Sequence, residues 1–243
     1  MEQRTESRSV MLAPQRPRVR NLRSRLGIAA LVGGTCISAV VFTIAPVEAT
    51  PVVPAAQNIA PQKNSVRVDD PLAAVAVDAL TELRAYVRSG DTVTLASYKA
   101  TRDGIADEIA NRLAIDAGTL RQVWDIADVP HQMALMAAFT QLGVPYHRNQ
   151  SKPGEGFDCS GLTTYAWGVA GTTLTRQSAS QIRAAAARTK ETAQAGDLVY
   201  YPGHAMLYLG VDYAIVHAPY SGRTVEVDVI GRRRSVRFGN PLG

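Results

Sequence analysis

The chain has 243 residues, of which 46% are hydrophobic, as in a folded protein of one or two domains. Its formal net charge of +5 comes from the first 25 residues, which hold seven arginines and two glutamates, whereas residues 50–243 hold 19 basic and 18 acidic side chains. The basic balance therefore belongs to the N-terminus and gives no support for nucleic-acid binding by the folded part.

The N-terminus has the pattern of an export signal. A basic stretch ends at Arg25, a 20-residue apolar run follows from Leu26, and the small-x-small tripeptide Val47-Glu48-Ala49 lies directly behind it. We predict a signal peptide over residues 1–49. The alternative is a retained membrane anchor, since 20 apolar residues can span a bilayer. In either case we expect the rest of the chain outside the cytoplasm, secreted or in the cell envelope.

The next part of the chain is predicted to be a linker followed by helices. Residues 50–70 are rich in Pro, Ala, Gln and Asn, which indicates a flexible linker. Asp70-Pro71 is typical of a helix cap followed by proline at the first helical position. Apolar periodicity predicts helices from there to Gly90, from about Val93 to Leu113, and over about 120–126. Residues 71–129 thus form a helical region that shows no recognisable chemistry.

Residues 130–243 change from a helical to a β-strand pattern. Helices are predicted over residues 130–143, from Cys159 to near Gly171, and from Ser178, as its cap, through Ile182 and the alanines after it. An irregular loop is predicted over 147–155. Strands are predicted over the β-prone runs 197–201, 205–209, 213–217, 224–229 and 236–238. Helices followed by a run of strands indicate an α+β fold with an antiparallel sheet packed on helices.

The segment Gly156-Phe-Asp-Cys-Ser-Gly-Leu162 places a cysteine directly after a good helix cap. With Asp158 as the cap, Cys159 lies in the first turn, where unpaired N–H groups and the helix dipole lower a thiol pKa. Removal of the leader also removes Cys36, so Cys159 would be the one cysteine left and could form no internal disulfide. We therefore predict a catalytic thiol; the alternative is a small buried apolar residue.

Two histidines flank a predicted hairpin around residues 210–212. A turn centred between Gly210 and Val211 would place His204 and His217 directly opposite each other, and a shift of two residues would keep them on one face as diagonal neighbours. One imidazole could then take the thiol proton while the other orients it. The alternatives are two ordinary half-buried histidines, or zinc held with Cys159, which separations of 45 and 13 residues disfavour.

These residues resemble the NlpC/P60 family of bacterial cell-wall cysteine peptidases over about residues 133–238. The resemblance rests on four segments that occur in the family's order, which are 156–162, 196–201, 203–210 and 215–218. It implies a papain-like catalytic domain over residues 130–243, at the C-terminus of an exported bacterial protein. We expect no cofactor and no metal.

The resemblance also implies roles for individual residues. Cys159 would be the nucleophile, His204 the general base and His217 the orienting third residue. The residues expected to border the active site or bind substrate are Tyr146, Asp158, Ser160, Arg176 and Ser178. The implied reaction is hydrolysis of peptidoglycan stem peptides, usually between D-γ-glutamyl and a diamino acid, through an acyl-enzyme. The alternatives are a cell-wall-binding module without turnover, and an amidase or acyltransferase with the same Cys-His-His set.

The sequence departs from the family pattern in two places. His147-Arg-Asn-Gln150 stands where Trp-Gly-Gly usually follows the tyrosine, and Ala205-Met206 stands where Val-Gly usually follows the base histidine. We expect the changed loop to affect substrate preference and the bulkier Ala205-Met206 pair to narrow the site. The helical region over 71–129 lies outside the resemblance, and it could cover the cleft, space the domain from the membrane or bind a partner.

Overall fold

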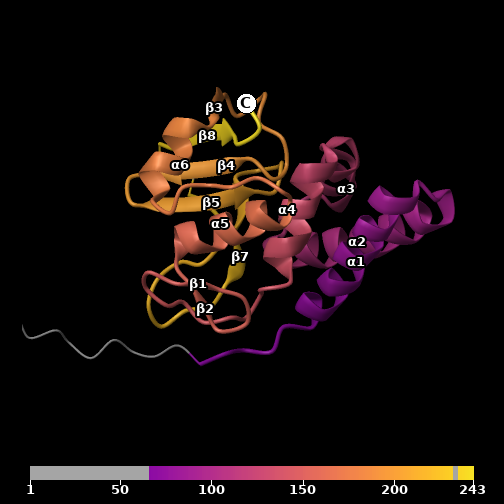
Figure 1. Cartoon of the computed structure of the whole chain (residues 1–243), viewed down its shortest axis with the longest axis horizontal. Helices are drawn as coiled ribbons and strands as arrows, with labels where there is room; N and C mark the ends of the chain where they lie inside the picture. The colour runs from indigo at the N-terminus through magenta and orange to yellow at the C-terminus, as the bar shows by residue number, and fades with distance from the viewer. Residues whose placement is uncertain (1–65, 232–234) are drawn as a thin grey trace, which may run out of the picture. The chain divides into compact units, whose positions relative to one another are not determined.

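The structure is a computed structural model that describes residues 66–231 and 235–243 (Figure 1). The expected signal peptide or anchor, and all but the last few residues of the expected linker, lie outside the described residues. None of the helices in the described ranges has both the length and the apolar character needed to cross a membrane.

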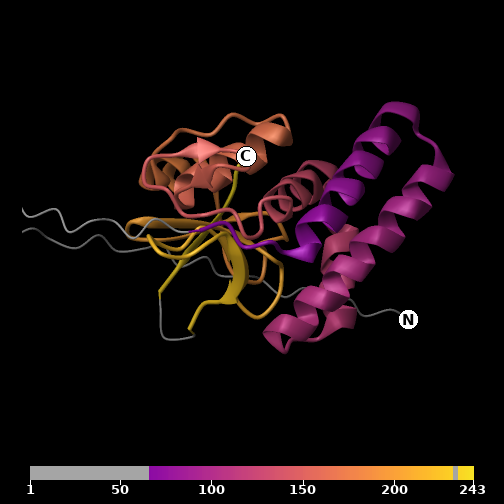
Figure 2. The same cartoon turned by 90° about the horizontal axis from the view of Figure 1, so that it is seen from below.

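Four helices come first in the described part of the chain, and an aspartate directly precedes each of them. They are α1 (Pro71–Ser89), α2 (Thr92–Leu113), α3 (Ala117–Ile126) and α4 (Val129–Phe139). The predicted start of α1 is confirmed, because the Asp70 side chain accepts a hydrogen bond from the Leu72 N–H and proline occupies the first position. α1 and α2 lie side by side as an antiparallel hairpin (Figure 2).

Helix α4 ends at Phe139, whereas the sequence predicts that this helix continues to Gly143. After Phe139 the chain turns, and the Gly143 N–H donates to the Val225 carbonyl at 2.9 Å while the Val225 N–H donates to Val144 at 2.8 Å. The backbone groups of Gly143 and Val144 are thus bonded to a distant segment and are not free to continue the helix. This pairing leads the chain directly to Tyr146 and the loop before Cys159.

The C-terminal part holds a six-stranded sheet in the order β3-β8-β4-β5-β6-β7, in which every paired strand is antiparallel. The predicted α+β fold, with an antiparallel sheet packed on helices and a helical region before it, is therefore confirmed. The elements are β1 (Ser151–Lys152), β2 (Gly156–Phe157), α5 (Cys159–Val169), α6 (Ser178–Ala184), β3 (Ala186–Arg188), β4 (Leu198–Tyr201), β5 (His204–Tyr208), β6 (Ala214–His217), β7 (Glu226–Val229) and β8 (Arg237–Asn240).

Three local expectations were wrong. The loop predicted over 147–155 contains β1, which pairs with β2. Gln177 rather than Ser178 is the N-cap of α6, and no side chain caps this helix. The helix ends at Ala184 instead of continuing through the later alanines, because Ala186 and Ala187 pair with β8 at the edge of the sheet. Ladder hydrogen bonds with a distant strand outweigh the helix propensity of alanine there.

The helical region shares its hydrophobic core with the rest of the described chain. One cluster of buried side chains runs from Leu72 in α1 to Val225 before β7. The indole N–H of Trp124 in α3 donates to the Leu209 carbonyl beyond β5 at 2.8 Å. The boundary predicted at residues 129 and 130 therefore falls within continuous packing and stays a prediction.

Candidate active site

Cys159 is the first residue of α5, as predicted. The Asp158 carboxylate caps the helix by accepting a hydrogen bond from the Gly161 N–H at 2.7 Å. The Cys159 thiol reaches the start of β5, where it lies 3.8 Å from the Gly203 carbonyl oxygen and faces the Ala205 N–H. The sulfur therefore contacts the main chain on both sides of His204.

The pKa of the Cys159 thiol is shifted in the direction opposite to the prediction. Burial raises the pKa of the Cys159 thiol above its ordinary value, and the charge of Asp158 adds to this. The N–H groups of Ala205 and Ser160 act in the opposite direction without reversing the shift. The predicted lowering of the thiol pKa by the helix start is thus wrong, because burial outweighs it. At neutral pH the thiol therefore carries its proton, and it could act as a nucleophile only with the help of a base.

His204 and His217 lie together on one face of the sheet, as predicted. Both are buried, and His204 Nε2 lies 2.9 Å from His217 Nδ1, within hydrogen-bond distance. The predicted register was wrong by two residues. Leu207 pairs with Val216, so the two histidines are diagonal neighbours. Asp212 and Tyr213 adopt positive φ angles, which moves the turn one residue later than the sequence suggests.

The sheet face that carries the two imidazoles is turned away from α5. Strand alternation places them with Met206 and Ile215, which pack in a second cluster, whereas Leu207 packs with residues of α5. The thiol therefore reaches β5 at the main chain of Gly203 and Ala205 rather than across the face that carries the imidazoles. Because His204 Nε2 and His217 Nδ1 face each other, they are oriented to share a proton rather than to ligate one metal with the sulfur.

An open cavity of about 680 Å³ lies in front of Cys159. Its lining includes Cys159 and all five residues that the resemblance assigns to the substrate site, together with residues from the loop after Tyr146 and the connector before α6. The lining residues are Tyr146, Arg148, Asn149, Asp158, Cys159, Ser160, Arg176, Gln177, Ser178, Ala179 and Gly203. His204 and His217 are not among these lining residues.

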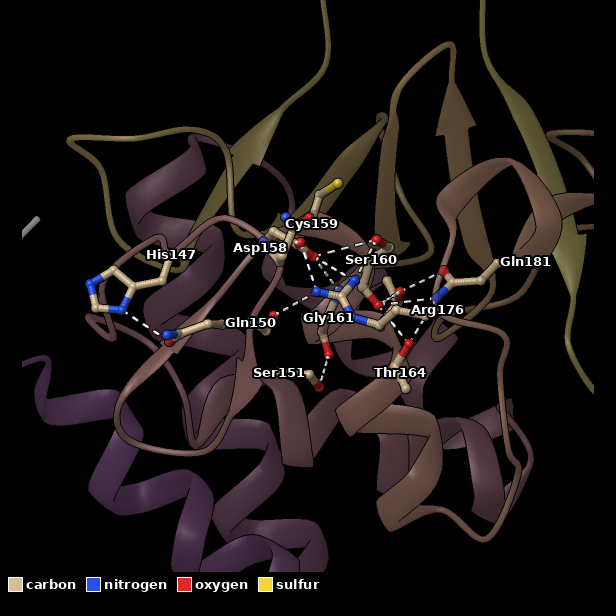
Figure 3. Close-up of polar contacts among 12 residues, drawn as sticks. His147, Gln150, Ser151, Asp158, Cys159, Ser160, Gly161, Thr164, Arg176 and Gln181 are labelled. Atoms are coloured by element: carbon tan, nitrogen blue, oxygen red, sulfur yellow. Dashed lines mark hydrogen bonds and ion pairs between the residues drawn. The ribbon is translucent and has the colours of Figure 1, made fainter. Parts of the chain in front are cut away.

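Three of the predicted substrate-site residues form one hydrogen-bonded group (Figure 3). Arg176 donates to both carboxylate oxygens of Asp158, at 2.8 and 2.7 Å, and to the Ser160 hydroxyl at 2.9 Å. Arg176 also donates to the Gln150 carbonyl at 3.0 Å. Asp158 thus serves both as the helix cap and as the counter-ion of Arg176, which fixes the guanidinium in the wall of the cavity.

Two supporting residues were not identified from the sequence. Gln150 supplies the carbonyl that accepts from Arg176, and the buried amide of Gln181 donates to the Ser160 carbonyl at 3.0 Å. Both lie outside the cysteine segment and reach it only through the fold. No local pattern marks a glutamine for such a role, so the sequence carries no signal for them.

Tyr146 lies beside the sulfur in the same cavity. Burial raises the pKa of its hydroxyl, and the neighbouring Cys159 and Asp158 act in the same direction, against Arg148 and Arg176. The phenol is therefore protonated at neutral pH and can donate a hydrogen bond to a group in the cavity.

Part of the chain is similar to known proteins. Residues 143–235 match the model of the NlpC/P60 family. The chain is similar to the bifunctional muramidase/DL-endopeptidase CwlT of Bacillus subtilis, with 35% identity over 85 residues that cover 33% of this chain and 26% of CwlT. It is also similar to the gamma-D-glutamyl-L-lysine dipeptidyl-peptidase of Bacillus cereus, with 36% identity over 94 residues, 35% of this chain and 28% of that protein.

One of the solved structures that the chain resembles is an NlpC/P60 domain. The structure is that of RipD from Mycobacterium tuberculosis, described as a non-catalytic NlpC/p60 domain protein, with 24% identity, a TM-score of 0.39, and coverage of 47% of this chain and 98% of RipD. The chain spans about a quarter of the length of the first curated relatives. Residues 143–235, which include Cys159, His204 and His217, are thus the part of the chain that matches the NlpC/P60 family.

Proposed function

We propose that the chain is an exported peptidoglycan hydrolase in which the Cys159 thiol cleaves stem peptides. One observation carries the proposal most directly. The sulfur lies at the wall of an open cavity and contacts the main chain on both sides of His204, whose ring is hydrogen-bonded to His217. Membership of a family of cell-wall peptidases supports the same reaction class.

The reaction begins with a protonated thiol. His204 Nδ1 accepts the thiol proton as the sulfur attacks the carbonyl carbon of the scissile amide, and His217 orients the imidazole. The first-turn N–H groups of α5 stabilise the developing oxyanion. The leaving amine takes the proton from His204, which leaves an acyl-thioester on Cys159. His204 then deprotonates a water molecule, which releases the acid and restores the thiol.

The residues around the cavity support a short peptide with charged groups as the substrate. Arg148 is exposed at the cavity, and Arg176 and Asp158 form a fixed ion pair in its wall. Stem peptides combine free carboxylates with amide bonds. The B. cereus relative is named for a γ-D-glutamyl-L-lysine bond. We therefore propose the bond between D-γ-glutamyl and a diamino acid as the one cleaved.

Digestion of purified peptidoglycan by the full chain tests this proposal. We expect mass spectrometry to find fragments cut within the stem peptide, and we expect Cys159→Ala to release none. Equal release by both proteins would remove the nucleophile assignment. Release of whole stem peptides from the sugar would identify an amidase instead.

A cell-wall-binding module without turnover is the second candidate. The raised pKa of the thiol favours it, because a protonated thiol is a weak nucleophile. Co-sedimentation of the wild-type chain with peptidoglycan, with no fragment released at any pH, would establish this candidate.

A further inference from the structure

The far ring nitrogen of His217 has unusual surroundings. Nε2 is buried and lies 3.7 Å from Glu226 Oε1 and 4.0 Å from Asp228 Oδ2. These distances are within reach of an ion pair but longer than a hydrogen bond. Hydrogen bonds at catalytic sites are often long in unliganded structures and tighten when substrate binds. Two carboxylates therefore face the one nitrogen of His217 that His204 does not use.

The sheet register builds this arrangement. His217 on β6 pairs directly with Glu226 on β7, and Asp228 lies two residues further along the same face. His204, His217 and Glu226 thus form a row across three neighbouring strands. Burial alone would raise the pKa of Glu226, but the His217 and Arg223 side chains hold it below its ordinary value. Glu226 is therefore ionised at neutral pH.

Arg223 holds the Glu226 carboxylate in place. Its Nη2 donates to Oε1 at 2.6 Å and its Nε donates to Oε2 at 3.1 Å. This two-point contact fixes the plane of the carboxylate as well as its position. One oxygen of a fixed anion is thereby kept beside His217 Nε2.

The position of the anion decides which nitrogen of each ring carries the proton. A carboxylate beside His217 Nε2 favours the tautomer with the proton on Nε2, and Nδ1 then offers a lone pair to His204. His204 must in turn donate from its own Nε2, so its Nδ1 carries no proton. Nδ1 is the ring nitrogen nearer the main chain, and the Cys159 sulfur contacts the main chain on both sides of His204. The opposite tautomers would place a proton on His204 Nδ1, which could not accept one from the thiol.

We propose that Glu226, clamped by Arg223 and assisted by Asp228, is a positioning residue that sets the tautomers of His217 and His204 so that His204 Nδ1 can take the thiol proton. The consequence for catalysis rests on the proposed function. The tautomers themselves can be measured whether or not the chain is a peptidase.

A divalent metal on the same three side chains is the competing interpretation. Ligand atoms around a tetrahedral zinc lie roughly 3.3 Å apart. Here His217 Nε2 lies 3.7 Å from Glu226 Oε1 and 4.0 Å from Asp228 Oδ2, which is wider than that spacing. Both oxygens of Glu226 are also engaged by Arg223. A metal on Nε2 would leave the proton of His217 on Nδ1, so the two interpretations require opposite tautomers.

Nitrogen-15 NMR of the imidazole rings in the full chain tests the proposal, since the two tautomers have distinct chemical shifts. We expect the proton on Nε2 in both His204 and His217. In the double variant Glu226→Gln/Asp228→Asn we expect a substantial fraction of His217 to carry its proton on Nδ1. With a stem peptide as substrate, we expect kcat to fall about 10-fold at unchanged KM.

Glu191→Gln is the matched control, because Glu191 is an exposed carboxylate on the turn between β3 and β4 and is not part of the row of His204, His217 and Glu226. We expect it to leave the tautomers and kcat unchanged. A proton on Nδ1 of His217 in the wild type, or tautomers that do not respond to the double substitution, would overturn the proposal. A wild type with the expected tautomers that releases no fragment from peptidoglycan would instead refute only the proposed function.

Discussion

At the scale of single residues, the reactivity of Cys159 depends on a balance between burial and nearby charge. Its place at the start of α5 favours a thiolate, whereas burial and the Asp158 carboxylate favour the thiol and prevail in the resting protein. Asp158 cannot simply be removed, because it caps α5 and pairs with Arg176. Under the proposed function the nucleophile is therefore protonated in the resting protein, and proton transfer to His204 becomes part of the attack.

Asp158→Asn separates the charge of this residue from its capping function, because asparagine is an equally good cap. Loss of the negative charge should lower the pKa of the Cys159 thiol, so alkylation at Cys159 should begin at lower pH. In the wild type we expect the midpoint above the value of about 8.5 for free cysteine. The measurement is the rate of iodoacetamide labelling against pH, followed on the Cys159 peptide by mass spectrometry.

Asp69→Asn is the control for this series, since Asp69 is exposed and lies outside the cavity. It should leave the labelling profile unchanged. A profile that moves to higher pH in Asp158→Asn, or does not move at all, would show that the charge of Asp158 does not act on the sulfur.

At the scale of elements, the features that depend on neighbouring residues in the chain, such as helix caps and strand alternation, could be predicted from the sequence. The starts of α1 and α5 follow from the caps Asp70 and Asp158, and the strand pattern places both histidines on one face. The pairing of Ala186 with β8 and the two-residue shift between β5 and β6 depend on strands and turns that no local pattern specifies. For the same reason Cys159, His204 and His217 could be proposed as site residues from the sequence, whereas Gln181 and Glu226 could not.

Gly143, in the turn after α4, lies close to the main chain of Val68 before α1. Its φ is +80°, and a Cβ atom there would lie 1.8 Å from the Val68 carbonyl oxygen. Gly90 has a similar φ of +69°, but a Cβ atom there would face open space, with no contact within 4 Å. We expect Gly90→Ala to cost about 1 kcal/mol from backbone strain, and Gly143→Ala to cost a further 1–3 kcal/mol or so from overpacking.

Urea unfolding of the two glycine variants measures this difference as a change in the free energy of unfolding. Equal losses in both variants would mean that the Val66–Asp70 segment moves aside without cost. A larger loss in Gly143→Ala would confirm that this segment is packed firmly against the turn after α4.

At the scale of the whole molecule, the described helices and the sheet share one hydrophobic core, so α1 to α3 should not unfold independently. Trp124 in α3 is fully buried and donates to the carbonyl of Leu209, beyond β5. This residue joins the helical region to the strand that carries His204. The helical region therefore contributes to the stability of the site even though it supplies none of the cavity lining.

Trp124→Ala should lower the free energy of unfolding by about 3–5 kcal/mol, because it removes a large buried side chain and a buried hydrogen bond. Ile126→Ala on the same helix should cost no more than about 0.5 kcal/mol, since Ile126 is 75% exposed. Chemical denaturation followed by circular dichroism measures both. A loss in Trp124→Ala as small as that in Ile126→Ala would show that the helical region is only loosely attached.

The central claim is that His204 removes the proton of the Cys159 thiol during attack on a stem peptide. The most direct measurement is kcat/KM for a stem peptide at neutral pH in wild type and His204→Ala, with circular dichroism as the check on folding. Loss of the general base should lower kcat/KM by about 10²–10⁴-fold. A folded His204→Ala protein that stays within about threefold of the wild-type rate would contradict the claim.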